Sequence, residues 1–223
     1  MHYILHIDTS ADTCTVAIAG DGNVISQLSH TDMRNHATVL NKMIDEVLVE
    51  SSITLETLSA IAVCGGPGSY TGLRIGLATA KAFCYVLDKP LLLDDKLTLL
   101  AWQQYHKNLS KYEFYVSVLP AREKEYYIST YNSEFVCLTK PQHAFEEVMK
   151  AIVTALNGEI LMTGISDLLT ESILSTSKIT SYEIQTIDMY EWALYAFEGY
   201  SCNRFVILST SEPYYLKQVY INK

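Results

Sequence analysis

The sequence is short of positive charge and has no long apolar run. Its 223 residues include 16 lysines and arginines against 25 aspartates and glutamates, a formal net charge of −9. An acidic chain repels a phosphate backbone, so we do not expect it to bind naked nucleic acid tightly on its own. No stretch of about 20 apolar residues occurs, so we expect no membrane-spanning helix.

Cysteine is also scarce, and its spacing differs from that of metal or redox sites. The five cysteines, at positions 14, 64, 84, 137 and 202, are odd in number, and no two form a C-x-x-C pair. The stretch MHYILHIDTS has no basic region followed by a long apolar one, so we expect no secretory signal there. These features predict reduced thiols in a cytoplasmic protein.

The sequence lacks the usual motifs for a metal ion or an activated nucleophile. His2 and His6 are four residues apart on an expected strand, where they stand two pleats apart and chelate poorly. No G-x-S-x-G nucleophile elbow is present. We therefore expect neither a metal site nor a cofactor. Asp8, followed by Thr9 and Ser10, can hold magnesium or position water, but a capped turn explains it equally well.

What the sequence does contain is one order of elements that occurs twice. We expect strands at residues 3–8, 13–19 and 24–29, a helix at 36–50, a strand at 60–63 and a helix at 71–87. The second half repeats this order, with strands at 114–119, 125–131 and 135–138, a helix at 144–156, a strand at 160–162 and a helix at 165–174. A strand at 91–93 and a helix at 96–105 lie between the two halves.

This repeated order predicts an α/β protein built from duplicated ribonuclease-H-like lobes. Because residues 106–111 are polar, we place the boundary there. The prediction is an N-terminal lobe at residues 1–105 and a smaller, more divergent C-terminal lobe at 106–223.

The most unusual segment is CGGPGSYTGLRIG, residues 64–76. A phosphate-binding Walker loop needs lysine and a hydroxyl after its last glycine, but Gly72 is followed by leucine and arginine. A dinucleotide loop needs a third glycine that is missing here. Shaping of the chain, with Ser69 or Thr71 capping the next helix, is therefore favoured over nucleotide binding. An anion at the helix N-terminus stays open, with contacts from Asp8, Thr9, Gly66, Gly68, Ser69 and Thr71.

Two expected helices carry more small or apolar residues than a narrow stripe needs. Gly72, Gly76 and Ala80 are four apart and line one face, where they allow another helix to approach closely. The helix at 36–50 has apolar residues over a wide face, including Ile44 and Leu48. Such helices either cover a sheet in the core or meet a partner protein.

Five motifs occur in the order and spacing of one family. They are ILHIDTS (residues 4–10), His36 with Leu40 and MID (43–45), GPGSYTGLRIG (66–76), AR (121–122) with EYY (125–127), and EPYYLK (212–217). With these motifs the chain resembles the TsaB (YeaZ) family, the bacterial tRNA threonylcarbamoyladenosine (t6A) biosynthesis subunit and a paralogue of TsaD. Three positions depart from the family pattern: Lys42 in place of proline, Pro120 in place of aspartate and Lys217 in place of arginine.

The resemblance implies the actin-like ATPase superfold and a scaffold or activating subunit with no catalytic residues. The metal-binding H-x-x-x-H of TsaD corresponds to His36 followed by Leu40, so the second ligand is absent. The implied partners are a TsaD-like catalytic subunit, with it the ATPase TsaE, a second copy through the same helices, and tRNA only indirectly. The implied interface residues are Val39, Leu40, Met43, Val47, Gly72, Leu73, Ile75, Gly76, Thr79 and Ala80.

An alternative from another class is an ATP-dependent transferase or hydrolase that uses the cleft between the lobes. In that interpretation Asp8 and residues 65–72 contact phosphate and magnesium. A third interpretation, direct binding of tRNA, is disfavoured by the acidic charge.

Overall fold

The computed structural model describes residues 1–31, 35–109, 111–164 and 178–215. The chain forms two compact units, the first containing Met1–Lys96 and Met189–Tyr214, and the second containing Leu97–Asp188. These units differ from the predicted lobes in two places. Residues 97–105 belong to the second unit, and residues 189–214 return to the first. In the described parts of the chain, no helix is long and apolar enough to cross a membrane.

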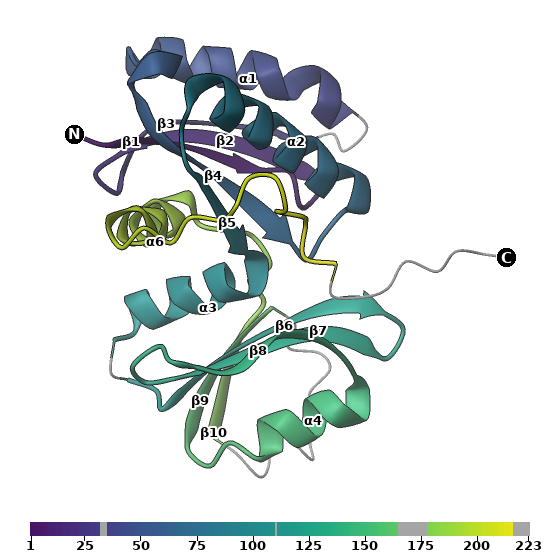
Figure 1. Cartoon of the computed structure of the whole chain (residues 1–223). Helices are drawn as coiled ribbons and strands as arrows, with labels where there is room; N and C mark the ends of the chain where they lie inside the picture. Colours follow the sequence, from purple (N-terminus) through teal and green to yellow (C-terminus); the bar gives the residue numbers. More distant parts are fainter. Residues whose placement is uncertain (32–34, 110, 165–177, 216–223) are drawn as a thin grey trace, which may run out of the picture. The chain divides into compact units, whose positions relative to one another are not determined.

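The first unit is a five-stranded sheet in the order β3-β2-β1-β4-β5 (Figure 1). Its strands are β1 (Tyr3–Asp8), β2 (Thr13–Gly20), β3 (Asn23–Thr31), β4 (Leu58–Gly66) and β5 (Leu91–Asp95). The first three strands are antiparallel, whereas β4 runs parallel to β1 and β5 parallel to β4. The turn between β2 and β3 has positive φ at Asp21 and Gly22, as a tight hairpin requires.

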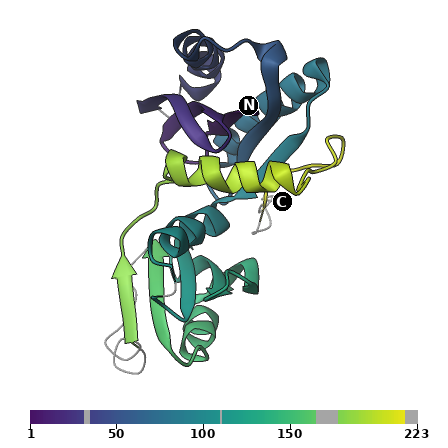
Figure 2. The same ribbon diagram turned by 90° about the vertical axis from the view of Figure 1, so that its left-hand side faces the viewer.

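Helices cover both faces of this sheet. Helices α1 (His36–Ser51) and α2 (Tyr70–Leu87) lie on one face, and α6 (Met189–Ser201) crosses the other (Figures 1 and 2). A short 3-10 turn, η2 (Leu55–Thr57), precedes β4. Since both faces are covered, β1 and β4 are buried along almost their whole length.

The second unit has the same strand order. Its sheet runs β8-β7-β6-β9-β10 and consists of β6 (Phe114–Arg122), β7 (Glu125–Asn132), β8 (Cys137–Phe145), β9 (Glu159–Gly164) and β10 (Lys178–Tyr182). Helix α4 (Glu146–Thr154) packs through Met149 and Val153 on one face. Helix α3 (Lys96–Lys107) packs through Leu97 and Leu100 against Leu119. The duplicated ribonuclease-H-like order is therefore confirmed, and the packing of α3 explains why residues 97–105 join the second unit.

Three details of the second unit differ from the sequence-based expectation. The third strand begins at Cys137 rather than at residue 135, because Asn132 accepts a hydrogen bond from the Val136 N–H and Phe135 adopts positive φ. The following helix spans 146–154 rather than 144–156. The strand β10 was not expected from the sequence, and neither was α6 of the first unit. The helix predicted at 165–174 lies outside the described residues.

Candidate functional site

The glycine-rich segment joins the turn after β1 to the start of α2. Asp8 Oδ1 accepts a hydrogen bond from the Ser10 N–H at 2.9 Å, and Ser10 O accepts one from the Ser69 N–H at 2.8 Å. The parallel strands β1 and β4 therefore end side by side, and the two loops that follow them bond to each other.

Two glycines in this segment are required by the backbone. Gly66 has φ +103°, a conformation that residues with a side chain rarely adopt. A Cβ on Gly68 would lie 2.2 Å from the carbonyl oxygen of Ser10, far inside contact distance. The loop glycines thus serve the close approach of two backbones, which supports the shaping interpretation.

The first turn of α2 is also occupied by internal hydrogen bonds. Ser69 caps the helix by accepting from the Gly72 N–H at 3.2 Å, as predicted. The hydroxyl of Thr9 donates to the carbonyl oxygen of Gly72 at 2.7 Å. Asp8 is buried in its capped turn, and the described residues contain no group of three or more His, Cys, Asp or Glu that could hold a metal ion. Of the six residues predicted for anion contact, only Thr71 and Gly68 are exposed.

The small residues of α2 face the sheet of their own unit. A Cβ on Gly72 would meet the carbonyl oxygen of Thr9 at 2.1 Å, and a Cβ on Gly76 would meet the Thr9 hydroxyl at 2.3 Å. Ala80 is buried in the same core. The close approach that these residues permit is therefore to β1 and the residue after it, and not to a helix of another protein.

This packing changes which residues of the two helices can reach a partner. Seven of the ten predicted interface residues are buried inside the first unit: Leu40, Met43, Val47, Gly72, Leu73, Gly76 and Ala80. The other three, Val39, Ile75 and Thr79, are half-buried. These seven residues are not available to contact a partner, because α1 and α2 use their apolar sides to cover the sheet.

The outward side of α2 is nevertheless mostly apolar. We use the name α2 face for the exposed residues Arg74, Ala78, Ala82, Tyr85 and Val86. The side chains of Tyr85 and Val86 are 82% and 78% exposed. The outward side of α1, by contrast, is mostly polar, with an ion pair of 3.6 Å between Lys42 and Glu46.

A groove of about 640 Å³ borders the α2 face. Its lining comes from α2 and from a segment about 120 residues later in the chain: Lys81, Ala82, Tyr85, Ile207, Leu208 and Ser209. Neither this groove nor the role of residues 207–209 was predictable, because nothing in the local sequence marks a segment that packs on a distant helix.

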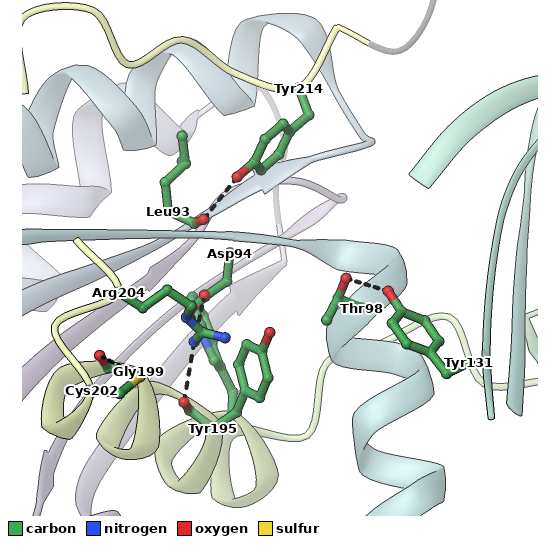
Figure 3. Close-up of polar contacts among 10 residues, drawn as sticks. Leu93, Asp94, Thr98, Tyr131, Tyr195, Gly199, Cys202, Arg204 and Tyr214 are labelled. Atoms are coloured by element: carbon green, nitrogen blue, oxygen red, sulfur yellow. Dashed lines mark hydrogen bonds and ion pairs between the residues drawn. The ribbon is translucent and has the colours of Figure 1, made fainter. Parts of the chain in front are cut away.

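A polar cluster centred on Asp94 was also missed (Figure 3). The buried carboxylate of Asp94 accepts from Trp192 Nε1 at 2.8 Å and pairs with the Arg204 guanidinium at 3.1 Å. That guanidinium also lies 3.9 Å from the centre of the Tyr195 ring. Burial raises the pKa of Asp94, and Arg204 and Trp192 offset part of this shift. The cluster ties α6 to β5, which gives it a structural role.

The cysteines do not supply a nucleophile to this region. None of the five, all of them described residues, is in a disulfide, and three of them, Cys14, Cys64 and Cys84, are buried. Burial raises the pKa of Cys14 and of Cys84 to about 12 and raises that of Cys64 further, so these thiols stay protonated at neutral pH.

Two ribonuclease-H-like units in series define the actin-like ATPase fold. The family model described as TsaD, tRNA N6-adenosine threonylcarbamoyltransferase, matches residues 23–183. The chain is 34% identical over 128 residues to the tRNA threonylcarbamoyladenosine biosynthesis protein TsaB of Haemophilus influenzae, covering 56% of this chain and 52% of that protein. It is 32% identical over 105 residues to TsaB of Escherichia coli, covering 47% of this chain and 45% of that protein. The chain thus spans about half the length of the curated relatives it matches.

Solved structures agree with this assignment at the level of the fold. A Pseudomonas aeruginosa protein described as similar to peptidase YEAZ matches with a TM-score of 0.77 and 22% identity, over 97% of this chain and 100% of that chain. The chain belongs to the TsaD family, and the curated relatives that it resembles include TsaB proteins.

Proposed function

We propose that this protein is a non-catalytic subunit in the synthesis of t6A on tRNA, which docks onto a TsaD-like catalytic subunit through the α2 face. The observation that carries the proposal is the exposed apolar side of α2, on a helix whose opposite side is already buried. Family membership supports the pathway, because the relatives are named for this modification.

The environment of His36 supports a non-catalytic role. His36 is buried, and its Nε2–H donates to the carbonyl oxygen of Asp12 at 3.0 Å. Leu40, where TsaD has its second histidine ligand, is buried in the core. A metal ion at this position would need His36 to release its internal partner and Leu40 to supply a donor atom that it does not have.

The chemistry of the α2 face suits a partner helix. Ala78 and Ala82 are one turn apart and permit a close helix–helix approach, while Tyr85 and Val86 present large apolar surfaces beside them. Burial of apolar surface contributes about 25 cal/mol per Å² before the cost of association. Through the catalytic subunit the complex would recruit the ATPase TsaE. Without that subunit, the same face would pair two copies of this chain.

Titration calorimetry with the TsaD-like subunit of the same organism tests the docking face. We expect Val86→Asp and Ala82→Glu each to weaken binding by about 30-fold or more, because each places a charge in an apolar contact. The matched control is Val148→Asp on α4 of the second unit, whose side chain is 51% exposed and which should bind like the wild type. Equal affinity of all four proteins would refute the α2 face as the docking surface.

Reconstitution of tRNA modification tests the functional role. We expect t6A to form when the catalytic subunit, TsaE and this chain are combined with substrates, and to fall sharply when this chain is left out. ATP turnover by the isolated chain that disappears on Asp8→Ala would instead support the enzymatic alternative.

A further inference from the structure

The segment after α6 crosses the first unit and bonds to three separate elements. We call residues 203–214 the C-terminal strap (Figure 2, yellow). The N–H of Val206 donates to the carbonyl oxygen of Leu91 in β5 at 3.0 Å, and Lys81 Nζ of α2 donates to the carbonyl oxygen of Ser211 at 3.1 Å. At the end of the strap, the N–H of Tyr214 donates to the carbonyl oxygen of Gly65 at 2.9 Å.

Tyr214 fits against the glycine-rich loop through its ring as well as its backbone. A Cβ on Gly65 would lie 2.7 Å from the Tyr214 ring, so the absence of a side chain at Gly65 is what lets the ring lie there. The Tyr214 hydroxyl donates to the carbonyl oxygen of Leu93 at 3.0 Å (Figure 3). Burial, with nearby carboxylates, raises the pKa of Tyr214 to about 12, so the hydroxyl keeps the proton that it donates.

The other end of the strap is anchored by Arg204. Its side chain pairs with the buried Asp94 and donates to the carbonyl oxygen of Tyr195 at 3.2 Å. The strap is thus held at Arg204 by β5 and α6, and at Tyr214 by Gly65 near the end of β4. Between these anchors it contributes Ile207 and Leu208 to the groove beside the α2 face.

We propose that Tyr214 is a positioning residue for the docking face: it holds the end of β4 at Gly65, from which the glycine-rich loop reaches Ser69, the cap of α2, within four residues. Loss of the ring frees the loop and the first turn of α2, and the helix then presents the α2 face less rigidly to a partner. The part of this inference that concerns partner affinity rests on the proposed function, whereas the part that concerns the loop does not.

Hydrogen exchange on the full chain tests the loop directly. We expect Tyr214→Ala to speed exchange of the amides of residues 65–73 by roughly 5- to 30-fold, which corresponds to a loss of about 1–2 kcal/mol of local stability. Tyr214→Phe keeps the ring over Gly65 and should restore most of the protection. Ile207→Ala is the matched control, since it removes a 72% exposed side chain from the same strap. The amides of β6 and β7 in the second unit serve as an internal reference.

A double-substitution cycle separates positioning from general destabilisation. Gly65→Ala places a methyl group against the Tyr214 ring and should itself speed exchange in residues 65–73. In the Tyr214→Ala background the same change should have a smaller effect, because the ring is gone and only the close approach to Leu93 Cδ1 at 2.9 Å remains. Additive effects, or unchanged exchange in Tyr214→Ala, would overturn the proposal. If Tyr214→Ala fails to fold, the comparison of Tyr214→Phe with Gly65→Ala still decides it.

Partner affinity is measured on the same variants. We expect Tyr214→Ala to weaken binding of the TsaD-like subunit by roughly 5- to 30-fold, with Tyr214→Phe near the wild type. Faster loop exchange with unchanged affinity would overturn the link between the strap and the docking face. If the wild-type chain did not bind the TsaD-like subunit at all, the proposed function would be refuted. The role of Tyr214 in holding residues 65–73 would then be tested by hydrogen exchange alone.

Discussion

The close contact between Gly76 and Thr9 predicts that Gly76→Ala destabilises the wild-type protein but stabilises a Thr9→Ala variant. Gly76 lies inside α2, where alanine is favoured over glycine by about 1 kcal/mol. In the wild type, however, the new methyl group would lie 2.3 Å from the Thr9 hydroxyl. We therefore expect Gly76→Ala to destabilise the first unit despite its better helix propensity.

The magnitude follows from what must move. Forcing an extra methyl group into a packed site costs about 1–3 kcal/mol. If Thr9 rotates away, it also loses its 2.7 Å hydrogen bond to Gly72 O, which contributes about 0.5–1.5 kcal/mol. After subtraction of the propensity gain, Gly76→Ala should lower the free energy of unfolding by about 2 kcal/mol.

The Thr9→Ala background removes the obstructing atom. The next atoms that the new methyl group would meet are Thr9 Cβ at 3.5 Å and Ile7 Cγ2 at 3.6 Å, which are ordinary contacts. Gly76→Ala should then stabilise the protein by about 1 kcal/mol, the propensity term alone.

Urea unfolding followed by the fluorescence of Trp192 measures both effects in the first unit. The chain has two tryptophans, and Trp102 belongs to the second unit, so all variants carry Trp102→Phe. The reasoning would be refuted if Gly76→Ala changed stability by the same amount, with the same sign, with and without Thr9→Ala.

Two further predictions follow from buried groups. His6 is fully buried against Trp192, and burial lowers its pKa to about 4 from the ordinary 6.5. Burial of the neutral imidazole therefore stabilises the fold fully above pH 6.5, and this stabilisation, about 3 kcal/mol in all, is lost as the pH falls toward 4. We expect the urea midpoint to fall less between pH 7 and 4.5 in His6→Phe than in the wild type. An equally steep fall in the variant would contradict this. A thiol reagent at neutral pH should modify the exposed cysteines 137 and 202 quickly and the buried cysteines 14, 64 and 84 only after unfolding, and rapid labelling of four or more thiols would count against the packing of the core.

Local sequence was sufficient for most of the first unit. Short apolar runs bounded by turn residues located β1, β4 and β5, and helical spacing located α1 and α2. The cap at Ser69 and the hairpin at Asp21 and Gly22 were also predictable, because they depend on residues within a few positions of each other.

Helix α6 shows where local pattern failed. Its buried residues Met189, Trp192, Ala193 and Ala196 have helical spacing, but the exposed Tyr190 and the half-buried aromatic residues Tyr195, Phe197 and Tyr200 mask the stripe. The placement of α6 on the first sheet depends on the hydrogen bond between Trp192 and Asp94, which are 98 residues apart in sequence.

The sequence by itself determined the repeated order of strands and helices, the α/β class and the sharp loop at Gly66–Gly68. Only the tertiary structure decided what each helix packs against. Glycines four apart mark a helix side that something approaches closely, but spacing is the same whether the neighbour is a strand of the same unit or a helix of a partner. For Gly72 and Gly76 the neighbour is Thr9, and for Gly65 it is the ring of Tyr214, because contacts between residues far apart in the chain form only when the whole unit folds.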